Sequence, residues 1–167
     1  MTSADELKQK LPAAVVSTGM QLNKPMAVIK KEELLNAARI VMEMGFDHLS
    51  VITGTDYTDR FEVVYNFFSY EKKQNLVLKV ITDHDAPEVD SLTSLWKGAD
   101  WLERETYDLV GIKFTGHPNL VRILLPDGWV GHPLRKDYDM NTEQFVTMGE
   151  DGNDIVSTDG KNLLRRK

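Results

Sequence analysis

Alternating apolar and polar residues predict a pair of antiparallel strands in the middle of the chain. Apolar side chains occupy alternate positions from 60 to 70 and again from 76 to 81, with a short polar loop at 71–75 between them. Strands that present one face to a core show this two-residue period, and a loop of this length closes a hairpin. Shorter apolar runs at 25–30 and 49–51 predict two further strands.

Apolar residues three and four positions apart predict the helices. The first helix spans 31–44, and Gly45 follows it where a helix C-cap belongs. A second is expected to begin within 87–98, after a cap at Asp90 or Ser91, and to be followed by helical sequence over 100–109.

The order of these elements predicts an α+β fold. We expect a single compact domain with a mostly antiparallel sheet covered by helices on one face, followed by an extended C-terminal tail. The predicted divisions are a polar leader at 1–24, the domain at 25–138, with a further short strand at 121–125, and a partner-binding tail at 139–167. The tail is expected to become ordered on a partner because it has few apolar residues to bury. Those residues are Phe145, Val146, Ile155, Val156, Leu163 and Leu164.

Composition narrows the function classes. A chain of 167 residues with 41% apolar content can form one substantial core, and its net charge of −6 argues against a general phosphate-binding surface. Cysteine is absent, which excludes disulfides, thiolate nucleophiles and cysteine-ligated iron–sulfur clusters in this chain. The first eleven residues lack the apolar stretch of a secretory signal, so a cytosolic chain is expected, with membrane association only through a partner.

Residues 103–138, called the signature segment below, concentrate charge, glycine, proline and aromatic residues. On a helix Arg104 and Asp108 are four apart and can pair, whereas Glu103 and Glu105 point away from each other. These carboxylates therefore make a poor acid–base dyad, and a solvated or partner-facing helix end with paired charges is the favoured interpretation.

A Gly-His-Pro element occurs twice in this segment, ending at Pro118 and Pro133. One alternative is a small metal-dependent hydrolase that uses His117 and His132 with Asp127 or Asp137 as a third ligand. The spacing matches no zinc pattern, and each imidazole can instead bind the backbone of a stiff turn. The glycines match no nucleotide-binding motif.

The end of the segment favours a protein interface. Trp129, Val130 and Leu134 lie beside the run Arg135 to Tyr138, and aromatic residues together with arginine are typical of protein–protein contacts. A nucleic-acid adaptor that uses Arg135, Lys136 and the terminal residues 165–167 is a second alternative, opposed by the acidic total charge.

The signature segment resembles that of the 30-kDa subunit (the C subunit) of respiratory complex I, the NADH–quinone oxidoreductase family. That family includes archaeal deazaflavin-coenzyme dehydrogenase and membrane-bound hydrogenase versions. The residues that fit the family pattern are Glu103, Arg104, Glu105, Tyr107, Asp108, Gly111, Phe114, His117, Pro118, Arg122, Pro126, Asp127, Gly131, His132, Pro133, Leu134, Arg135, Lys136, Asp137 and Tyr138.

The resemblance implies a non-catalytic subunit of the peripheral arm. It implies docking on the large 49-kDa-type subunit (the D subunit), with the B and I subunits as further partners, at the cytoplasmic face of the cell membrane. It also implies no cofactor here, with iron–sulfur clusters and quinone in partner subunits. Residues 139–145 depart from the continuation typical of NADH-driven members, which leaves NADH, reduced deazaflavin, ferredoxin and hydrogen open as electron donors.

Overall fold

The centre of the fold is a hairpin of two long strands, as the alternation predicts. In this computed structural model, which describes residues 1–141, 143–149 and 151–158, β4 (Arg60–Ser69) pairs antiparallel with β5 (Gln74–Asp83). Every second side chain is fully buried from residue 61 to 67 and from residue 76 to 80. These side chains are Phe61, Val63, Tyr65 and Phe67 on β4, and Leu76, Leu78 and Val80 on β5. Burial of this apolar stripe places the core on one face of the sheet.

A five-stranded sheet surrounds the hairpin, in the order β1-β2-β5-β4-β3. The outer strands are β1 (Val15–Gln21), β2 (Lys24–Ile29) and β3 (His48–Asp56). Only the pairing of β2 with β5 is parallel, so the sheet is mostly antiparallel and the predicted fold class is confirmed.

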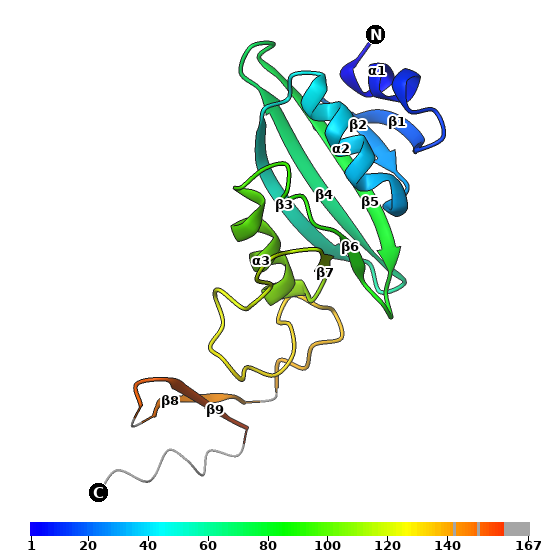
Figure 1. Cartoon of the computed structure of the whole chain (residues 1–167). Helices are drawn as coiled ribbons and strands as arrows, with labels where there is room; N and C mark the ends of the chain where they lie inside the picture. Colours follow the sequence, from blue (N-terminus) through cyan, green and yellow to red (C-terminus); the bar gives the residue numbers. More distant parts are fainter. Residues whose placement is uncertain (142, 150, 159–167) are drawn as a thin grey trace, which may run out of the picture.

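The helices pack on the core face of the sheet (Figure 1). They are α1 (Ser3–Lys10), α2 (Leu34–Glu43), which follows the short 3-10 helix η1 (Lys31–Glu33), and α3 (Ala99–Val110). Helix α3 and the residues just after it approach β3 at Gly54, where an added Cβ would lie 3.1 Å from Thr106 Cγ2 and 2.6 Å from Ile112 Cδ1. A glycine is therefore needed for this close contact.

The polar leader predicted for residues 1–24 is wrong as a structural description. Thr2 and Asp5 form a capping box that starts α1, and Ala4 and Leu7 are completely buried. Strand β1 then joins the edge of the main sheet. Two buried residues in a short, mostly polar helix gave too weak a pattern to be recognised in the sequence.

Two local predictions in the second half of the chain are also wrong. Residues 87–98 contain the short strand β6 (Glu88–Asp90) and turns, and helix α3 begins only at Ala99. Strand β6 pairs in parallel with β7 (Lys113–Thr115). Residues 121–125 form no strand, because the backbone N–H groups of residues 123–125 bind a side chain of α3.

Beyond Tyr138 the described tail contains a small hairpin. It consists of β8 (Phe145–Met148) and β9 (Asp154–Ser157) and lies away from the main sheet (Figure 1). Leu163, Leu164 and the basic residues 165–167 lie outside the described residues. Nowhere in the described ranges does a helix combine the length and apolar character needed to cross a bilayer.

Candidate functional site

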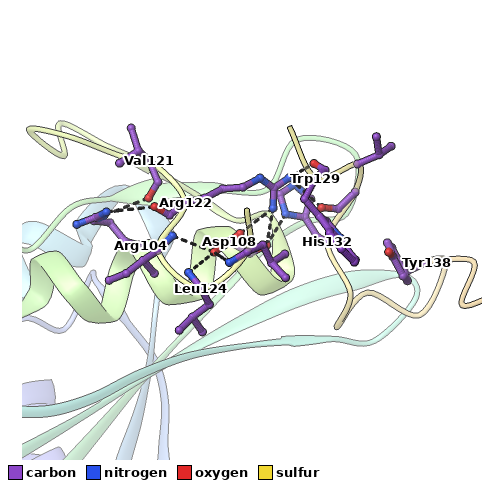
Figure 2. Close-up of polar contacts among 12 residues, drawn as sticks. Arg104, Asp108, Val121, Arg122, Leu124, Trp129, His132 and Tyr138 are labelled. Carbon is purple, nitrogen blue, oxygen red and sulfur yellow. Dashed lines mark hydrogen bonds and ion pairs between the residues drawn. The ribbon is translucent and has the colours of Figure 1, made fainter. Parts of the chain in front are cut away.

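Asp108 organises the loop that follows α3. Its side chain is fully buried near the end of the helix, and its Oδ2 accepts hydrogen bonds from the backbone N–H groups of Ile123, Leu124 and Leu125 at 2.8–2.9 Å. Its Oδ1 accepts from Arg122 Nη1 at 2.7 Å. One carboxylate therefore holds a tight turn of the loop against the helix (Figure 2).

These donors determine the charge of Asp108. Burial alone would raise the pKa of its carboxyl group, but the N–H groups of Leu125 and Ile123, the Arg122 guanidinium and the N–H group of Leu124 outweigh burial. The pKa of Asp108 is therefore held below its ordinary value, and the group is a carboxylate at neutral pH.

Arg122 joins two further parts of the loop to the same point. Besides the Asp108 carboxylate, it donates to the backbone oxygens of Trp129 at 3.1 Å and Gly131 at 2.9 Å. Arg104, which was expected to pair with Asp108, instead donates to the carbonyls of Val121 and Arg122. The predicted Arg104–Asp108 pair is wrong because both side chains reach the loop rather than each other.

The signature segment also caps the C-terminus of α3. The last carbonyls of a helix have no partner within it and carry a partial negative charge. His132 Nδ1 lies 2.9 Å from the carbonyl of Asp108, the Leu134 N–H donates to Leu109, and Arg135 Nε donates to Val110 at 2.7 Å. Arg135 also binds the carbonyl of Gly111, the left-handed residue that ends the helix.

A second anchor ties the segment to the β3–β4 turn. The backbone N–H of Lys136 donates to Asp56 Oδ2, and His84 Nε2 lies 3.4 Å from Asp56 Oδ1. Phe61 stacks on His84, and the Arg135 guanidinium lies 5.2 Å from the Phe61 ring centroid. Asp56 and His84 were not expected from the sequence, because neither belongs to a local pattern that points to residues so distant in the chain.

Glu103 is buried in a separate position on α3. Ser91 Oγ donates to it at 2.7 Å, and the Leu92 N–H donates at the same distance. Burial, with a smaller contribution from Asp100, raises the pKa of Glu103 to about 7 against these two hydrogen bonds. The expectation of a solvated or partner-facing helix end is therefore wrong for Glu103 and Asp108, which are buried within the chain, although Glu105 is exposed.

The two histidines of the Gly-His-Pro elements belong to different networks. The ring of His117 is buried, its Nδ1 accepts from the Asn119 N–H, and its Nε2 lies 3.3 Å from the carbonyl of Asp100. The pKa of His132 is lowered, first by burial and then by the nearby arginines Arg122 and Arg135. No group of three potential metal ligands occurs among the residues that the structure describes.

The remaining predicted residues lie at the surface of the segment. Pro118, Asp127, Lys136 and Asp137 are exposed, and Pro133 is partly exposed. A hollow of about 310 Å³ is lined by Val130, Gly131, His132, Arg135, Asp137, Tyr138, Asp139 and Gln144. Gln144 holds one side of it, since its amide binds both backbone groups of Val130 and the Tyr138 hydroxyl.

The apolar side chains of the loop are directed outward. The following four residues, called the loop surface below, are each about half exposed or more: Val121 at 46%, Leu124 at 59%, Val130 at 60% and Leu134 at 61%. The charged groups of Asp108, Arg122 and Arg135 are directed inward. The loop therefore exposes apolar side chains while it buries several charged groups, and such apolar exposure is typical of an interaction surface.

Comparison with known proteins places the chain in a family. A family model described as "Respiratory-chain NADH dehydrogenase, 30 Kd subunit" matches residues 27–144. The chain belongs to this family. The resemblance found in the signature segment is thereby confirmed and extends over most of the folded domain.

Individual relatives of the chain are C subunits of the same family. The C subunit of an NADH-quinone oxidoreductase from Roseiflexus sp. (strain RS-1) is 40% identical over 151 residues, which cover 87% of each chain. The corresponding C subunit from Moorella thermoacetica is 43% identical over 141 residues, covering 83% of this chain and 94% of the relative. The chain is thus a subunit of a multi-subunit complex I-type respiratory assembly.

Solved structures show the same fold. A trypsin-resistant fragment (1–134) of Nqo5 has a TM-score of 0.61 and 30% identity, with 70% of this chain and 95% of the fragment covered. A chain of the membrane-bound sulfane sulfur reductase, an archaeal respiratory membrane complex, has a TM-score of 0.71 at 22% identity and covers 82% of this chain and 84% of its own.

Proposed function

We propose that this chain is a non-catalytic subunit that docks on the large 49-kDa-type subunit of a membrane-bound, ion-translocating NADH–quinone oxidoreductase-type complex. In this function it supports electron transfer from the donor to quinone by holding the peripheral arm together. The B and I subunits of the peripheral arm are further partners, and the complex holds the chain at the cytoplasmic face of the membrane. Iron–sulfur clusters and quinone belong to the partners.

The observation that carries this proposal is that the signature segment turns three of its charged groups inward and several apolar side chains outward. Asp108 is bound by Arg122 and by the turn at 123–125, and Arg135 is bound by the carbonyls that end α3, so these groups are not arranged around a reactive centre. Its apolar residues form the loop surface instead. A rigid, polar-braced loop that presents apolar side chains loses little conformational entropy on association, as a docking element requires.

The chemistry of the chain supports the same conclusion. Without cysteine it supplies no thiolate ligand to an iron–sulfur cluster. Glu103, whose pKa is strongly raised, is buried behind Ser91 and Leu92. It contributes to the fold rather than to an open cleft. The internal network accounts for Asp108, Arg122 and Arg135, and the exposed apolar residues of the loop surface are left for a partner.

The test separates docking from folding. Leu124→Asp places a charge on the loop surface without removing a side-chain hydrogen bond. We expect the full chain to keep its melting temperature but to recover less of the large subunit when it is isolated from its native membranes in mild detergent. Tyr70→Asp is the matched control, because Tyr70 is 63% exposed at the distant β4–β5 turn. Unchanged recovery of the large subunit with Leu124→Asp would refute docking through this surface.

A further inference from the structure

The face of the sheet opposite the helices has no covering layer among the described residues. Strand register places Val51, Thr53, Glu62, Val64, Asn66, Val77 and Lys79 on this face, called the open face below. Near the β1–β2 turn it contains a hollow of about 130 Å³ lined by Gln21, Leu22, Lys24, Val51, Val64, Asn66 and Val77. Cavities that bind small-molecule ligands usually measure about 300–1,000 Å³, so this hollow fits a single side chain.

The β1–β2 turn presents Leu22 in an unfavourable way. Leu22 and Asn23 have φ angles of 48° and 62°, which is the left-handed pair of a type I′ hairpin turn. Asparagine suits this conformation, whereas leucine is disfavoured because its Cβ approaches the backbone. The Leu22 side chain is also 89% exposed. A strained, exposed leucine at the rim of an apolar hollow indicates a role outside the isolated fold.

Two amide side chains in the lining have unpaired oxygens. Gln21 Oε1 and Asn66 Oδ1 are shielded from water and have no hydrogen-bond partner among the described residues. Because neither oxygen is engaged, either amide can turn toward an occupant without breaking a hydrogen bond at that atom. An occupant that supplies a donor would remove the cost of leaving these acceptors unpaired.

The lining also determines the charge of the occupant. Lys24 is the charged residue among those that line the hollow, and it opposes a lysine or arginine. A cation favours the face of an aromatic ring. A tyrosine has an apolar ring for Val51, Val64 and Val77, and its hydroxyl both donates and accepts, so it matches the amides in either orientation.

We propose that the open face is a second docking surface, on which another subunit of the complex inserts an aromatic side chain with a hydrogen-bond donor, best matched by tyrosine. The partner is a subunit because the family places this chain in a multi-subunit assembly. The surface is separate from the loop surface, and it does not depend on which subunit docks there.

The first experiment maps the contact in the intact complex. A photo-cross-linking amino acid replaces Thr53, which is exposed on the open face beside Val64 but does not line the hollow. After irradiation of the purified complex, mass spectrometry identifies the attached peptide. A peptide from another subunit that contains tyrosine or tryptophan supports the proposal. Attachment to a second copy of this chain, to a peptide without either residue, or to nothing overturns it.

The second experiment uses two variants that remove an unfavourable feature from the isolated chain. Leu22→Gly removes backbone strain, and Asn66→Leu removes an unpaired acceptor, so neither should lower the melting temperature of the full chain. Each should lower retention of the chain in the complex about tenfold, as expected for damage to an interface anchor. Lys73→Gly is the matched control, since Lys73 also has a positive φ, 51°, but lies at the β4–β5 turn.

Full retention of both variants in the complex would overturn the proposal. If docking through the loop surface is wrong, Leu124→Asp leaves recovery of the large subunit unchanged. That result does not affect the Thr53 cross-link, which is measured in complexes that have already assembled.

Discussion

Two buried carboxyl groups of α3, five positions apart, show how hydrogen-bond donors decide the effect of burial. Both Glu103 and Asp108 have no exposed surface. Asp108 faces backbone N–H groups and an arginine, which together lower its pKa. Glu103 accepts from Ser91 and Leu92, and its pKa is raised to about 7. Burial disfavours the charged form in each case, and only sufficient donors reverse that effect.

Glu103 is expected to make stability depend on pH. Its pKa is raised from 4.5 to about 7, so the folded chain binds the proton more tightly. Its contribution is therefore complete below pH 4.5 and is lost as the pH rises through about 7. Across that window the free energy of unfolding should fall by up to roughly 3 kcal/mol more in the wild-type chain than in Glu103→Gln.

Urea denaturation at a series of pH values measures this difference. Glutamine can still accept from Leu92 and donate to Ser91, so the variant keeps both contacts without the titration. Parallel pH profiles for the wild-type chain and Glu103→Gln would show that the Glu103 pKa is not raised in the folded chain.

Asp108→Asn should be costly because the amide replaces one accepting oxygen with a donor. We expect a loss of roughly 3 kcal/mol in the free energy of unfolding, and faster hydrogen exchange at residues 123–125. Since the pKa of Asp108 is lowered in the folded chain, its contribution to the free energy of unfolding is present above pH 3.8. That contribution is lost as the pH falls through the lower pKa of the folded state. Asp137→Asn, at an exposed carboxylate, is the control and should change stability by about 0.5 kcal/mol or less.

At the scale of elements, the signature segment completes a helix that the local sequence leaves unfinished. The terminal carbonyls of α3 form hydrogen bonds with His132, Leu134 and Arg135. These three residues belong to a loop more than twenty residues further along the chain. The loop in turn is braced by Asp108 and Arg104 of the same helix. Each element therefore supplies the polar partners that the other needs.

Gly111 is where the helix and the loop are packed most closely. An added Cβ would lie 2.5 Å from His132 Cδ2 and 2.7 Å from Arg135 Nη2, and the residue has a φ of 80°. Gly111→Ala should therefore lose the cap as well as introduce backbone strain, with a total cost of roughly 2–4 kcal/mol in the free energy of unfolding.

Gly116→Ala separates these two effects. Gly116 has a φ of 83° but open space where its Cβ would be, so only backbone strain of about 1 kcal/mol is expected. Thermal or urea unfolding compares the two variants directly. Equal losses would mean that the contacts of His132 and Arg135 contribute nothing measurable.

At the scale of the whole molecule, polar groups brace the fold, and two of its surfaces present apolar groups to the outside. The loop surface and the hollow of the open face lie on different parts of the chain, and each presents aliphatic side chains to the outside. The proposed function requires such separate contacts, and the internal network holds the loop surface in one conformation in the isolated chain, which lowers the entropy lost on docking.

Arg122→Ala tests the link between bracing and docking. Removal of its bonds to Asp108, Trp129 and Gly131 leaves a buried carboxylate without its cation, so the free energy of unfolding should fall by roughly 3 kcal/mol. Recovery of the large subunit should fall as well. This variant differs from Leu124→Asp, which should lower recovery alone, and an unfolding loss without any loss of recovery would separate the loop conformation from docking.

Much of the fold was determined by patterns within short stretches of sequence. The alternation of β4 and β5 and the apolar spacing of α2 are local, so the hairpin, the first long helix and the α+β class were predicted. The charged and glycine-rich signature likewise identified the family. Helix α1 and strand β6 were missed because their burial depends on the elements packed against them.

The partners of the site residues were decided only by the tertiary structure. Sequence spacing suggested that Arg104 would pair with Asp108, but hydrogen bonds to the loop satisfy both side chains better. Asp56 and Lys136 meet across eighty positions of chain, and no periodic pattern encodes such a contact. The sequence thus determined the signature that places the chain in its family, while three-dimensional packing decided which of the signature residues face inward and which stay exposed, because burial and hydrogen bonding depend on the assembled neighbours.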